Sequence, residues 1–441
     1  MATESTAVTA TAEPSLPEVH ASVRLSRSRL PWRRLLGFLG PGFLISVGYM
    51  DPGNWATDIA GGSRFGYTLL SVIMISNLMA VLLQSLSLKL GVASERDLAQ
   101  LCRERYGLWV SFALWIGAEI AIAACDLAEV IGSAIALNLL FHIPLFYGVL
   151  ITGLDVLLIL LLQRWGFRLI EALVIALIGT IIAMFAVQLF FSRPEYGPAL
   201  FNLFVPSAQI VTNPTMLFIA IGMLGATVMP HNLYLHSSIV QSRKYKRTPE
   251  GKREAIFMSN IDSALALTLA LFVNAAIVVV AAAVFHRSGH FEVAAIEDAY
   301  KLLSPLVGAA GASTLFAIAL LASGQNSSIT GTLAGQVVME GFVHIKVQPW
   351  LRRMITRSIA IVPTIIVVWF TGERGTEKLL LLSQVILSLQ LSFAVVPLVI
   401  FTGNRKVMGE FVNGRVLQAL AWFVAVLIAG LNAWFLVLMM K

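Results

Sequence analysis

The chain is short of charge and of cysteine. Only 12% of its 441 residues are Asp, Glu, Lys or Arg, whereas soluble domains carry roughly a quarter. Its two cysteines, Cys102 and Cys125, fall in a predicted loop and a predicted apolar segment, which disfavours a disulfide framework or a cysteine metal cluster. The HExxH, GxSxG and Walker signatures are lacking. These shortages disfavour a soluble domain, a disulfide-stapled secreted protein and an intramembrane enzyme.

Apolar sequence is abundant instead. Hydrophobic residues make up 58% of the chain and the mean hydropathy is +0.82, which predicts an all-α integral membrane protein. The net charge of +7 would also suit a nucleic-acid-binding protein. However, the basic residues lie between apolar segments, where the positive-inside rule accounts for them. We therefore expect the lipid bilayer as a partner and no nucleic acid.

The apolar segments predict eleven transmembrane helices. They lie near residues 38–62, 67–89, 108–140, 144–163, 168–192, 214–241, 255–285, 310–342, 350–371, 378–402 and 415–440. Residues 37–402 would form a ten-helix core with halves at 37–192 and 213–402, and residues 403–441 would hold the eleventh helix. Residues 1–36 are predicted to be a disordered cytoplasmic tail. No apolar run precedes the arginines of this tail, so it is not a cleavable signal peptide.

The distribution of Lys and Arg predicts the orientation. Most of the 31 basic residues fall in alternate segments between the spans. The densest run lies between the sixth and seventh spans and consists of Arg243, Lys244, Lys246, Arg247, Lys252 and Arg253. The positive-inside rule then places the N-terminus in the cytoplasm and the C-terminus outside, in the inner (plasma) membrane of the cell.

Two similar tetrapeptides interrupt the first and sixth spans. Asp51-Pro52-Gly53-Asn54 and Met229-Pro230-His231-Asn232 share the pattern X-Pro-X-Asn. Proline removes a helical hydrogen bond, so each span is predicted to unwind at mid-membrane, where broken backbone is tolerated only when it is buried or lines a cavity. The topology directs the two spans oppositely, which predicts an inverted repeat of five plus five spans and a substrate site at the breaks.

The first break supplies charge and oxygen. An ionised Asp at this depth costs a few kcal/mol unless it faces water, a cation or another partner. We interpret Asp51 and Asn54 as ligands of a bound cation. The alternative is that Asp51 only caps the second half of the helix, since Asp before Pro-Gly is a good turn former.

The second break supplies a soft atom. Methionine usually just fills gaps in apolar helices, but Met229 occupies the position equivalent to Asp51. A thioether adds little for Mg2+ or Ca2+ and favours softer divalent metals. The carbonyl of Ala226 is the best-placed backbone ligand. His231 could be a ligand, a proton acceptor or a neighbour that tunes Asp51, and we favour a tuning or gating role.

These motifs resemble those of the Nramp family. The resemblance rests on residues 48–54, on residues 229–232 and on a third stretch, residues 324–332 (GQNSSITGT), and it extends over residues 37–440. The chain is most similar to bacterial members. The resemblance implies a LeuT-type fold with helices 1 and 6 unwound, alternating access, and import of Mn2+ or Fe2+, also Cd2+ or Co2+, together with protons. It carries the ligand role to Asp51, Asn54, Met229 and the Ala226 carbonyl, joined in some states by the Gly48 carbonyl and Gln384.

A second group of polar residues lies on the third span. Glu119, Asp126 and Glu129 are seven and three residues apart and so share one helix face. Arg353 and Arg357 at the start of the ninth span are candidate partners. The group is either a static buried ion-pair network or, as the resemblance implies, a proton route linked to Asp51. Isolated polar residues in other spans, Asn274 among them, are explained by hydrogen bonds between helices.

Two rival functions remain open. A LeuT-type transporter that carries an amino acid with Na+ should offer helix N-termini and small residues, rather than an Asp opposite a Met. A channel would not need two unwound helices. We expect no cofactor, no catalysis and no obligate protein partner.

Overall fold

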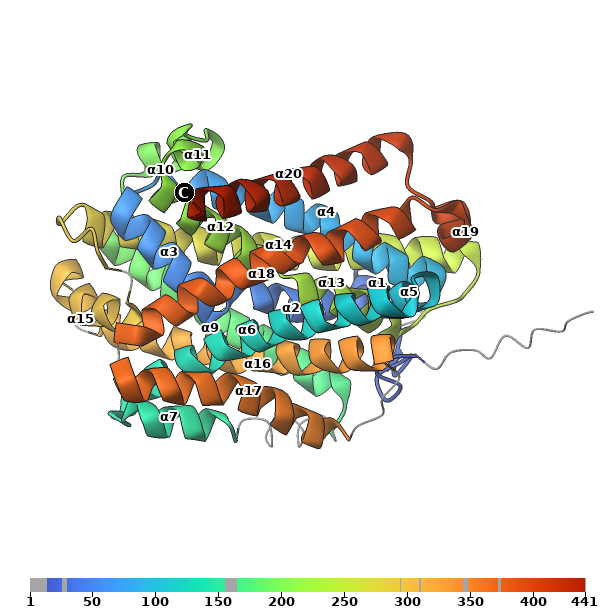
Figure 1. Cartoon of the computed structure of the whole chain (residues 1–441), viewed down its shortest axis with the longest axis horizontal. Coiled ribbons are helices and arrows are strands. Elements are labelled where there is room, and N and C mark those ends of the chain that lie inside the picture. The colour runs from blue at the N-terminus through green and yellow to red at the C-terminus, as the bar shows by residue number, and fades with distance from the viewer. Residues whose placement is uncertain are drawn as a thin grey trace, which may run out of the picture.

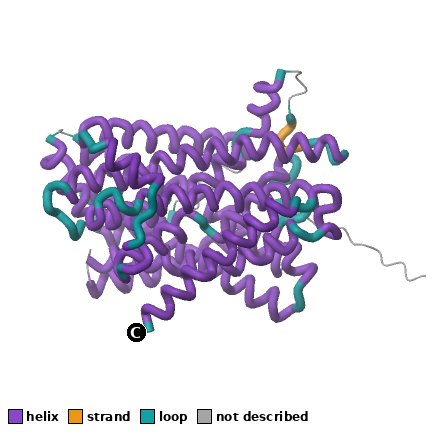
Figure 2. Tube along the Cα trace, turned by 90° about the horizontal axis from the view of Figure 1, so that it is seen from above, coloured by secondary structure: helices purple, strands orange, loops and turns teal. Residues whose placement is uncertain are grey.

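The computed structural model describes residues 14–25, 30–154, 165–293, 295–308, 311–343, 348–371 and 374–440. Within them the chain is almost entirely helical, and its long helices lie side by side (Figure 1). Short helices, loops and a single pair of two-residue strands lie mainly toward the ends of this bundle (Figure 2). The predicted all-α fold is confirmed.

The first half of the chain holds the elements up to residue 212. They are β1 (Val23–Arg24), α1 (Pro31–Phe38), α2 (Pro41–Val47), the 3₁₀ turn η1 (Gly48–Met50), α3 (Pro52–Phe65), α4 (Leu70–Ser94), α5 (Leu98–Arg105), α6 (Leu108–Phe141), α7 (Leu145–Thr152), α9 (Phe167–Ser192), α10 (Tyr196–Phe204) and α11 (Gln209–Thr212).

The second half repeats the plan. Its elements are α12 (Pro214–Thr227), α13 (Pro230–Ile239), η2 (Val240–Ser242), β2 (Arg243–Lys244), α14 (Pro249–Ala281), the π-helical turn η3 (Ala282–His286), α15 (Ile296–Val307), α16 (Ala312–Val343), α17 (Pro349–Thr371), α18 (Arg374–Thr402), α19 (Arg405–Met408), η4 (Gly409–Phe411) and α20 (Arg415–Met439).

The helices follow the predicted spans closely. Seven helical stretches of the described chain are long and apolar enough to cross a membrane: α4, α6, α9, α12 to η2, α14 to η3, α18 and α20. The predicted fourth span runs into residues 155–164, which lie outside the described residues. The count of eleven therefore stays a prediction.

The two broken spans run in opposite directions. The long half of the first, α3, contacts the long half of the second, α12, while the short halves α2 and α13 contact each other. Because α3 follows its break and α12 precedes its own, this pairing requires antiparallel spans. The inverted repeat predicted from the two breaks is thus present in the structure.

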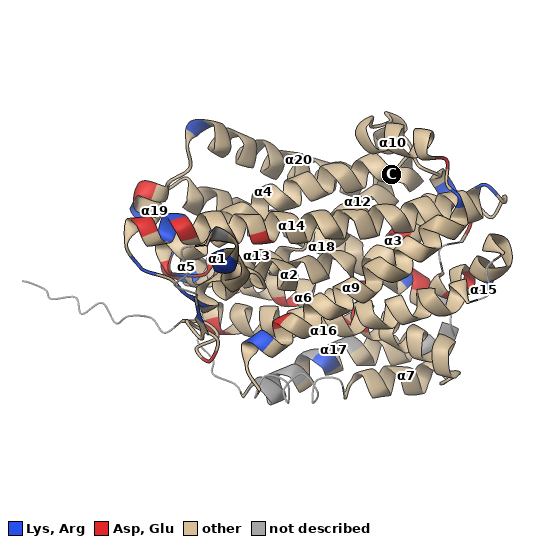
Figure 3. Ribbon diagram, turned by 180° about the vertical axis from the view of Figure 1, so that it is seen from behind, with Lys and Arg blue, Asp and Glu red and all other residues tan. Residues whose placement is uncertain are grey.

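The two ends of the bundle differ in what they carry. We call the N-side the end with α1, α5, α19 and residues 14–25, and the C-side the end with α10, α11, α15 and the last turn of α20 (Figure 1). Lys and Arg gather mainly around α1, α5 and α19 on the N-side (Figure 3). The short halves α2 and α13 face this end.

The described part of the N-terminal tail is ordered, which differs from the prediction. Residues 1–36 were expected to be disordered, but β1 pairs in parallel with β2, and Leu16, Val19 and Val23 are buried against the main core. Residues 31–36 belong to α1. The low average hydrophobicity of the tail concealed three apolar side chains at a spacing that one face of a short segment can bury.

Candidate metal-ion site

The first break is a direct consequence of Pro52. α2 ends at Val47, η1 continues for three residues, and Asp51 is extended (φ −71°, ψ 165°) before α3 begins at Pro52. In an α-helix the carbonyl of residue 48 would accept a hydrogen bond from the amide of residue 52, which a proline does not have. The Gly48 carbonyl therefore has no α-helical donor.

The second break obeys the same rule. α12 ends at Thr227, Met229 is extended (φ −74°, ψ 125°), and α13 begins at Pro230. The carbonyl four residues before this proline is that of Ala226. The X-Pro spacing thus frees equivalent carbonyls in both halves, which is the physical basis for the two backbone ligands named from the sequence.

Asp51 caps α3 and still keeps an oxygen free. One carboxylate oxygen, Oδ1, accepts a hydrogen bond from the backbone amide of Asn54 at 2.8 Å, while Oδ2 has no partner. Asn54 donates through Nδ2 to the Tyr49 carbonyl at 2.6 Å, and its Oδ1 is likewise without a partner. Both side chains are buried. Buried oxygens without partners are unfavourable unless something binds them, so capping alone does not explain Asp51.

Side chains hold the other carbonyls of the first break in place. The Tyr49 carbonyl accepts from Asn54 and, at 2.8 Å, from Asn274 of α14. The Met50 carbonyl accepts from the Trp55 indole at 3.1 Å and from Ser323 of α16. Asn274 makes the kind of interhelical bond expected for it, and it makes that bond at the break itself.

The second break closes on the first at Gly48. A Cβ at Gly48 would collide with the Asn232 amide and come within 3.1 Å of the Met229 sulfur. The Gln384 amide of α18 likewise lies so close to Gly53 that a Cβ there would overlap it. Glycine at these two positions lets the side chains of Met229 and Gln384 reach the backbone of the first break.

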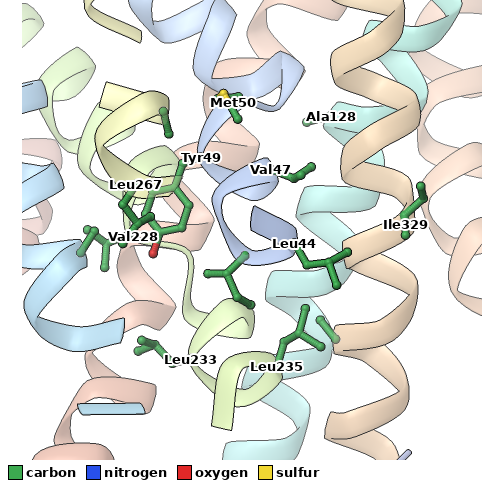
Figure 4. Close-up of a cluster of buried hydrophobic side chains, with 14 of the residues drawn as sticks. Leu44, Val47, Tyr49, Met50, Ala128, Val228, Leu233, Leu235, Leu267 and Ile329 are labelled. Carbon is green, nitrogen blue, oxygen red and sulfur yellow. The ribbon is translucent and has the colours of Figure 1, made fainter. Parts of the chain in front are cut away.

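The centre formed by the two breaks is closed to solvent. Asp51, Asn54, Ala226, Met229 and Gln384 are each at most 1% exposed. Figure 4 shows Leu44, Val47, Tyr49 and Met50 packed among apolar side chains of neighbouring helices. Within the described residues no group of three or more His, Cys, Asp and Glu is placed to hold a metal ion. A cation at this centre would instead meet one carboxylate, neutral oxygens and a thioether, a set that binds without the tight hold of a structural zinc site.

Two histidines of α13 differ in their surroundings. His231 is buried and its Nδ1 has no hydrogen-bond partner. His236, five residues on, is joined through Nδ1 to the Gln84 carboxamide oxygen at 2.9 Å, and Gln84 donates to the Tyr49 hydroxyl at 2.8 Å. This chain of polar groups runs from Tyr49 at the first break through Gln84 of α4 to His236 of α13.

A buried ion cluster joins α6, α16 and α17. Arg357 lies 3.1 Å from Glu129 and 3.6 Å from Asp126, and it donates to the Ser328 hydroxyl at 2.7 Å. Ser328 donates in turn to Glu129 at 3.1 Å. The arginine and both acids are at most 1% exposed. Of the two candidate arginines, Arg357 pairs with the acids, whereas the side chain of Arg353 lies outside the described residues.

The third acid of α6 stands apart from this cluster. Glu119 is half-buried two turns earlier on the helix and accepts a hydrogen bond from the Trp115 indole at 3.1 Å. Cys125 lies between the cluster and the breaks: it packs against Met229, and its thiol donates to Glu129 at 3.6 Å. Cys125 thus belongs to the apolar cluster of Met229 and bonds to Glu129 of the ion cluster.

A polar network fixes the start of α2 on the N-side. Arg243 pairs with Glu171 at 2.7 Å and donates to the Leu39 carbonyl at 2.7 Å. Asp262 of α14 accepts from the amides of Gly40 and Gly42 at 3.1 and 2.7 Å. These bonds hold the start of α2 against α9 and α14.

A cavity of about 590 Å3 lies on the N-side surface, apart from the breaks. Arg96, Glu104, Arg247 and Lys406 are among its lining residues, as is Glu95. Partial burial pushes the pKa of Glu95 up, but Lys252 and Arg247 outweigh it and leave that pKa below its ordinary value. The carboxylate is therefore a stable anion in a cationic setting, which gives this cavity no evident part in binding a metal ion.

Sequence reasoning overlooked three kinds of residue. Asp58 is a buried carboxylate two turns beyond Asp51 on α3, and its Oδ2 has no partner; its seven-residue spacing from Asp51 was the available signal. Gln84 and His236 were signalled only as polar residues in apolar spans. Ser323, one residue before the third motif, bonds to the first break, a contact that no local pattern indicates.

Two enclosed breaks in oppositely directed helices define a multi-pass membrane transporter with a LeuT-type inverted repeat. A nucleobase-cation-symport-1 transporter, Mhp1, in a closed conformation shares this fold, with a TM-score of 0.60 at 16% identity over 90% of this chain and 91% of that chain.

Closer relatives identify the family. The profile described as "Natural resistance-associated macrophage protein-like" matches residues 42–438. The "divalent metal cation transporter MntH" of Nostoc sp. is 62% identical over 96% of both chains, and that of Mesorhizobium japonicum is 59% identical over 95% of this chain and 92% of that protein. A crystal structure of the Eremococcus coleocola manganese transporter gives a TM-score of 0.88 at 43% identity, covering 95% of this chain and 90% of that one. The chain belongs to the Nramp family.

Proposed function

We propose that this protein imports divalent transition-metal ions, Mn2+ and Fe2+ with Cd2+ and Co2+ as further cargo, across the plasma membrane. The observation that carries the proposal is the pair of buried, partner-free oxygens on Asp51 and Asn54, with the Met229 sulfur closing on the same turn. The carboxylate favours a cation, and the thioether favours a soft one. The names of the MntH relatives and of the Eremococcus manganese transporter agree with this cargo.

The ligands follow from the two breaks. In the enclosed state Asp51, Asn54, Met229 and the Ala226 carbonyl hold the ion. The Gly48 carbonyl and Gln384 join as the helix halves move, because both already lie at the first break. A single carboxylate keeps the ion exchangeable, as transport requires.

Alternating access accounts for the closed centre. We assign the N-side to the cytoplasm because it carries the basic run from Arg243 to Arg253, which leaves the C-terminus outside. The bonds of Arg243 and Asp262 to residues 39–42 then close the cytoplasmic exit, and their release frees α2 to move.

Protons are transported together with the metal ion, and the ion cluster of α6 is their route. Asp126 and Glu129 are buried acids that lie against Arg357, and Cys125 connects Glu129 to the cluster of Met229. Protonation of either acid weakens its bond to Arg357, which couples proton entry to the packing behind the thioether. His231 tunes or gates this region. Glu119, on the N-side of the two acids along α6, extends the route toward the cytoplasm, and Arg353 is the second candidate counter-charge.

Uptake into proteoliposomes tests the proposal. Mn2+ should accumulate above the level of protein-free liposomes, faster when the outer side is acidic, and without any need for Na+. Na+-dependent uptake of an amino acid would favour the rival LeuT-type function. A Mn2+ flux that never saturates would favour a channel. Absence of Mn2+ and Fe2+ uptake by correctly folded protein would refute the proposal.

A further inference from the structure

Residues 14–25 bridge two groups of elements at the N-side. We call this segment the clasp. On one side it joins the chain just after α13: Ala21 donates to the Gln241 carbonyl at 3.0 Å, and Val23 and Arg24 pair with Arg243 and Lys244. On the other side it joins the last turns of α16: the Leu16 amide donates to Glu340 at 2.8 Å, and Gln336 donates to Glu18 at 3.0 Å.

The clasp is also anchored by apolar burial. Leu16 is 1% exposed, and Val19 and Val23 are buried in the same core cluster as residues of α2, α13 and α16. A solvated tail would keep these side chains in water only at a cost, since burial of each Leu or Val is favourable. The segment is therefore a docked part of the fold.

Its position matters because of what it spans. α13 is the short half of the second broken span, and α16 is the long helix that contacts both α13 and α2. Any path from the enclosed centre to the N-side must part the short halves from the helices facing them. The clasp connects α16 to residues 241–244, which directly follow the short half α13. In sequence the clasp precedes α1 and the other short half, α2.

We propose that the clasp holds the N-side exit closed and must undock before the enclosed centre opens to that side. This inference rests on the proposed function for its biological meaning, since the exit is the one through which metal would leave. The docked residues 14–25 would then oppose opening of the N-side.

Thiol labelling tests the inference without any metal. Ser46 of α2 is completely buried, so a Ser46→Cys side chain reacts with a membrane-impermeant maleimide on the N-side only when that side opens. Removal of residues 1–25 should raise the labelling rate at least about threefold over the full-length Ser46→Cys chain. The parent chain, whose Cys102 and Cys125 are buried, gives the background. Equal or slower labelling in a folded truncated chain would overturn the inference.

Point substitutions in the clasp provide a second test in case truncation impairs folding. In the full-length Ser46→Cys chain, Leu16→Asp places a charge in the buried anchor and should speed labelling as truncation does. Ser22→Asp adds the same charge at an exposed position of the clasp and should leave the rate unchanged. If the Leu16→Asp and Ser22→Asp variants have equal labelling rates, the clasp does not restrain the exit. Because labelling needs no Mn2+, a failure of Mn2+ uptake would count against the proposed function alone.

Discussion

The two breaks share one sequence pattern and have opposite chemistry. At the first, Asn54, Asn274, Trp55 and Ser323 bond to the carbonyls of Tyr49 and Met50, and Asp51 supplies a charge. At the second, Met229 packs against Ala121, Cys125 and Leu387. In the described chain, no side-chain hydrogen bond to the carbonyls of residues 226–229 is found. The comparison teaches that charge and softness are supplied separately. In the proposed function the first break attracts a divalent cation, and the second decides which one.

Loss of the charge at the first break should have the largest effect. We expect Asp51→Ala to lower Mn2+ uptake by about a hundredfold or more, because a divalent ion would face only neutral ligands at membrane depth. Asp51→Asn can still cap α3 but lacks the charge, and it should fail as well. Uptake assays in proteoliposomes, with thermal unfolding as the check on folding, measure both. Near-normal uptake by Asp51→Asn would mean that capping alone matters.

The matched asparagines of the two breaks should differ in importance. Asn54→Ala removes both a free oxygen and the bond to Tyr49, so the KM for Mn2+ should rise about tenfold, which is roughly 1.4 kcal/mol. Asn232→Ala also removes a buried oxygen without a partner, but the bond that Asn232 donates to the Ile45 carbonyl is long, at 3.5 Å, so the KM should rise less. An equal rise in KM for the two variants would contradict the division of roles between the breaks.

Removal of the soft atom should change selectivity more than rate. We expect Met229→Ala to transport Mn2+ within about threefold of the parent, and to admit Ca2+ or Mg2+ that the parent rejects, because the site then offers only oxygen ligands. Competition of Ca2+ with Mn2+ uptake measures this change. If the competition is the same in both proteins, the thioether plays no part in discrimination.

The smallest effect is expected from the support of the first break. Asn274→Ala removes one of two hydrogen bonds to the Tyr49 carbonyl, so the cost should be about 1 kcal/mol of folding free energy. A modest fall in thermal stability with a small rise in KM is the expected outcome. Thr268→Ala removes an exposed hydroxyl that bonds within α14 and serves as the control. No difference between the two would show that Asn54 alone fixes this carbonyl.

Local chemistry explains how much of this molecule the sequence could predict. Helices follow from long apolar runs, and the breaks follow from Pro52 and Pro230, because proline acts on its own turn. The convergence of Met229 and Gln384 on the first break agrees with the ligand set that the family resemblance implied. Their roles as ligands remain predictions.

What escaped prediction depends on contacts between distant segments. Asn274 and Ser323 meet the first break from helices more than two hundred residues away. Arg357, one of the two arginines named from the sequence, lies against Glu129. The clasp was missed because average composition hides three well-spaced apolar side chains. Pairings of this kind are set by the packed fold and leave no periodic signal in the sequence.

The tight fit around Gly48 and Gly53 has a consequence for the state in which an ion can occupy the centre. The Asn232 and Gln384 amides lie against these glycines, and every ligand candidate is closed to bulk water. In the proposed function, an ion held here has exchanged bound water for protein ligands. Mg2+ parts with water reluctantly, whereas softer ions regain more from a thioether. In the proposed function the cost of dehydration therefore adds to the preference of the thioether for softer ions.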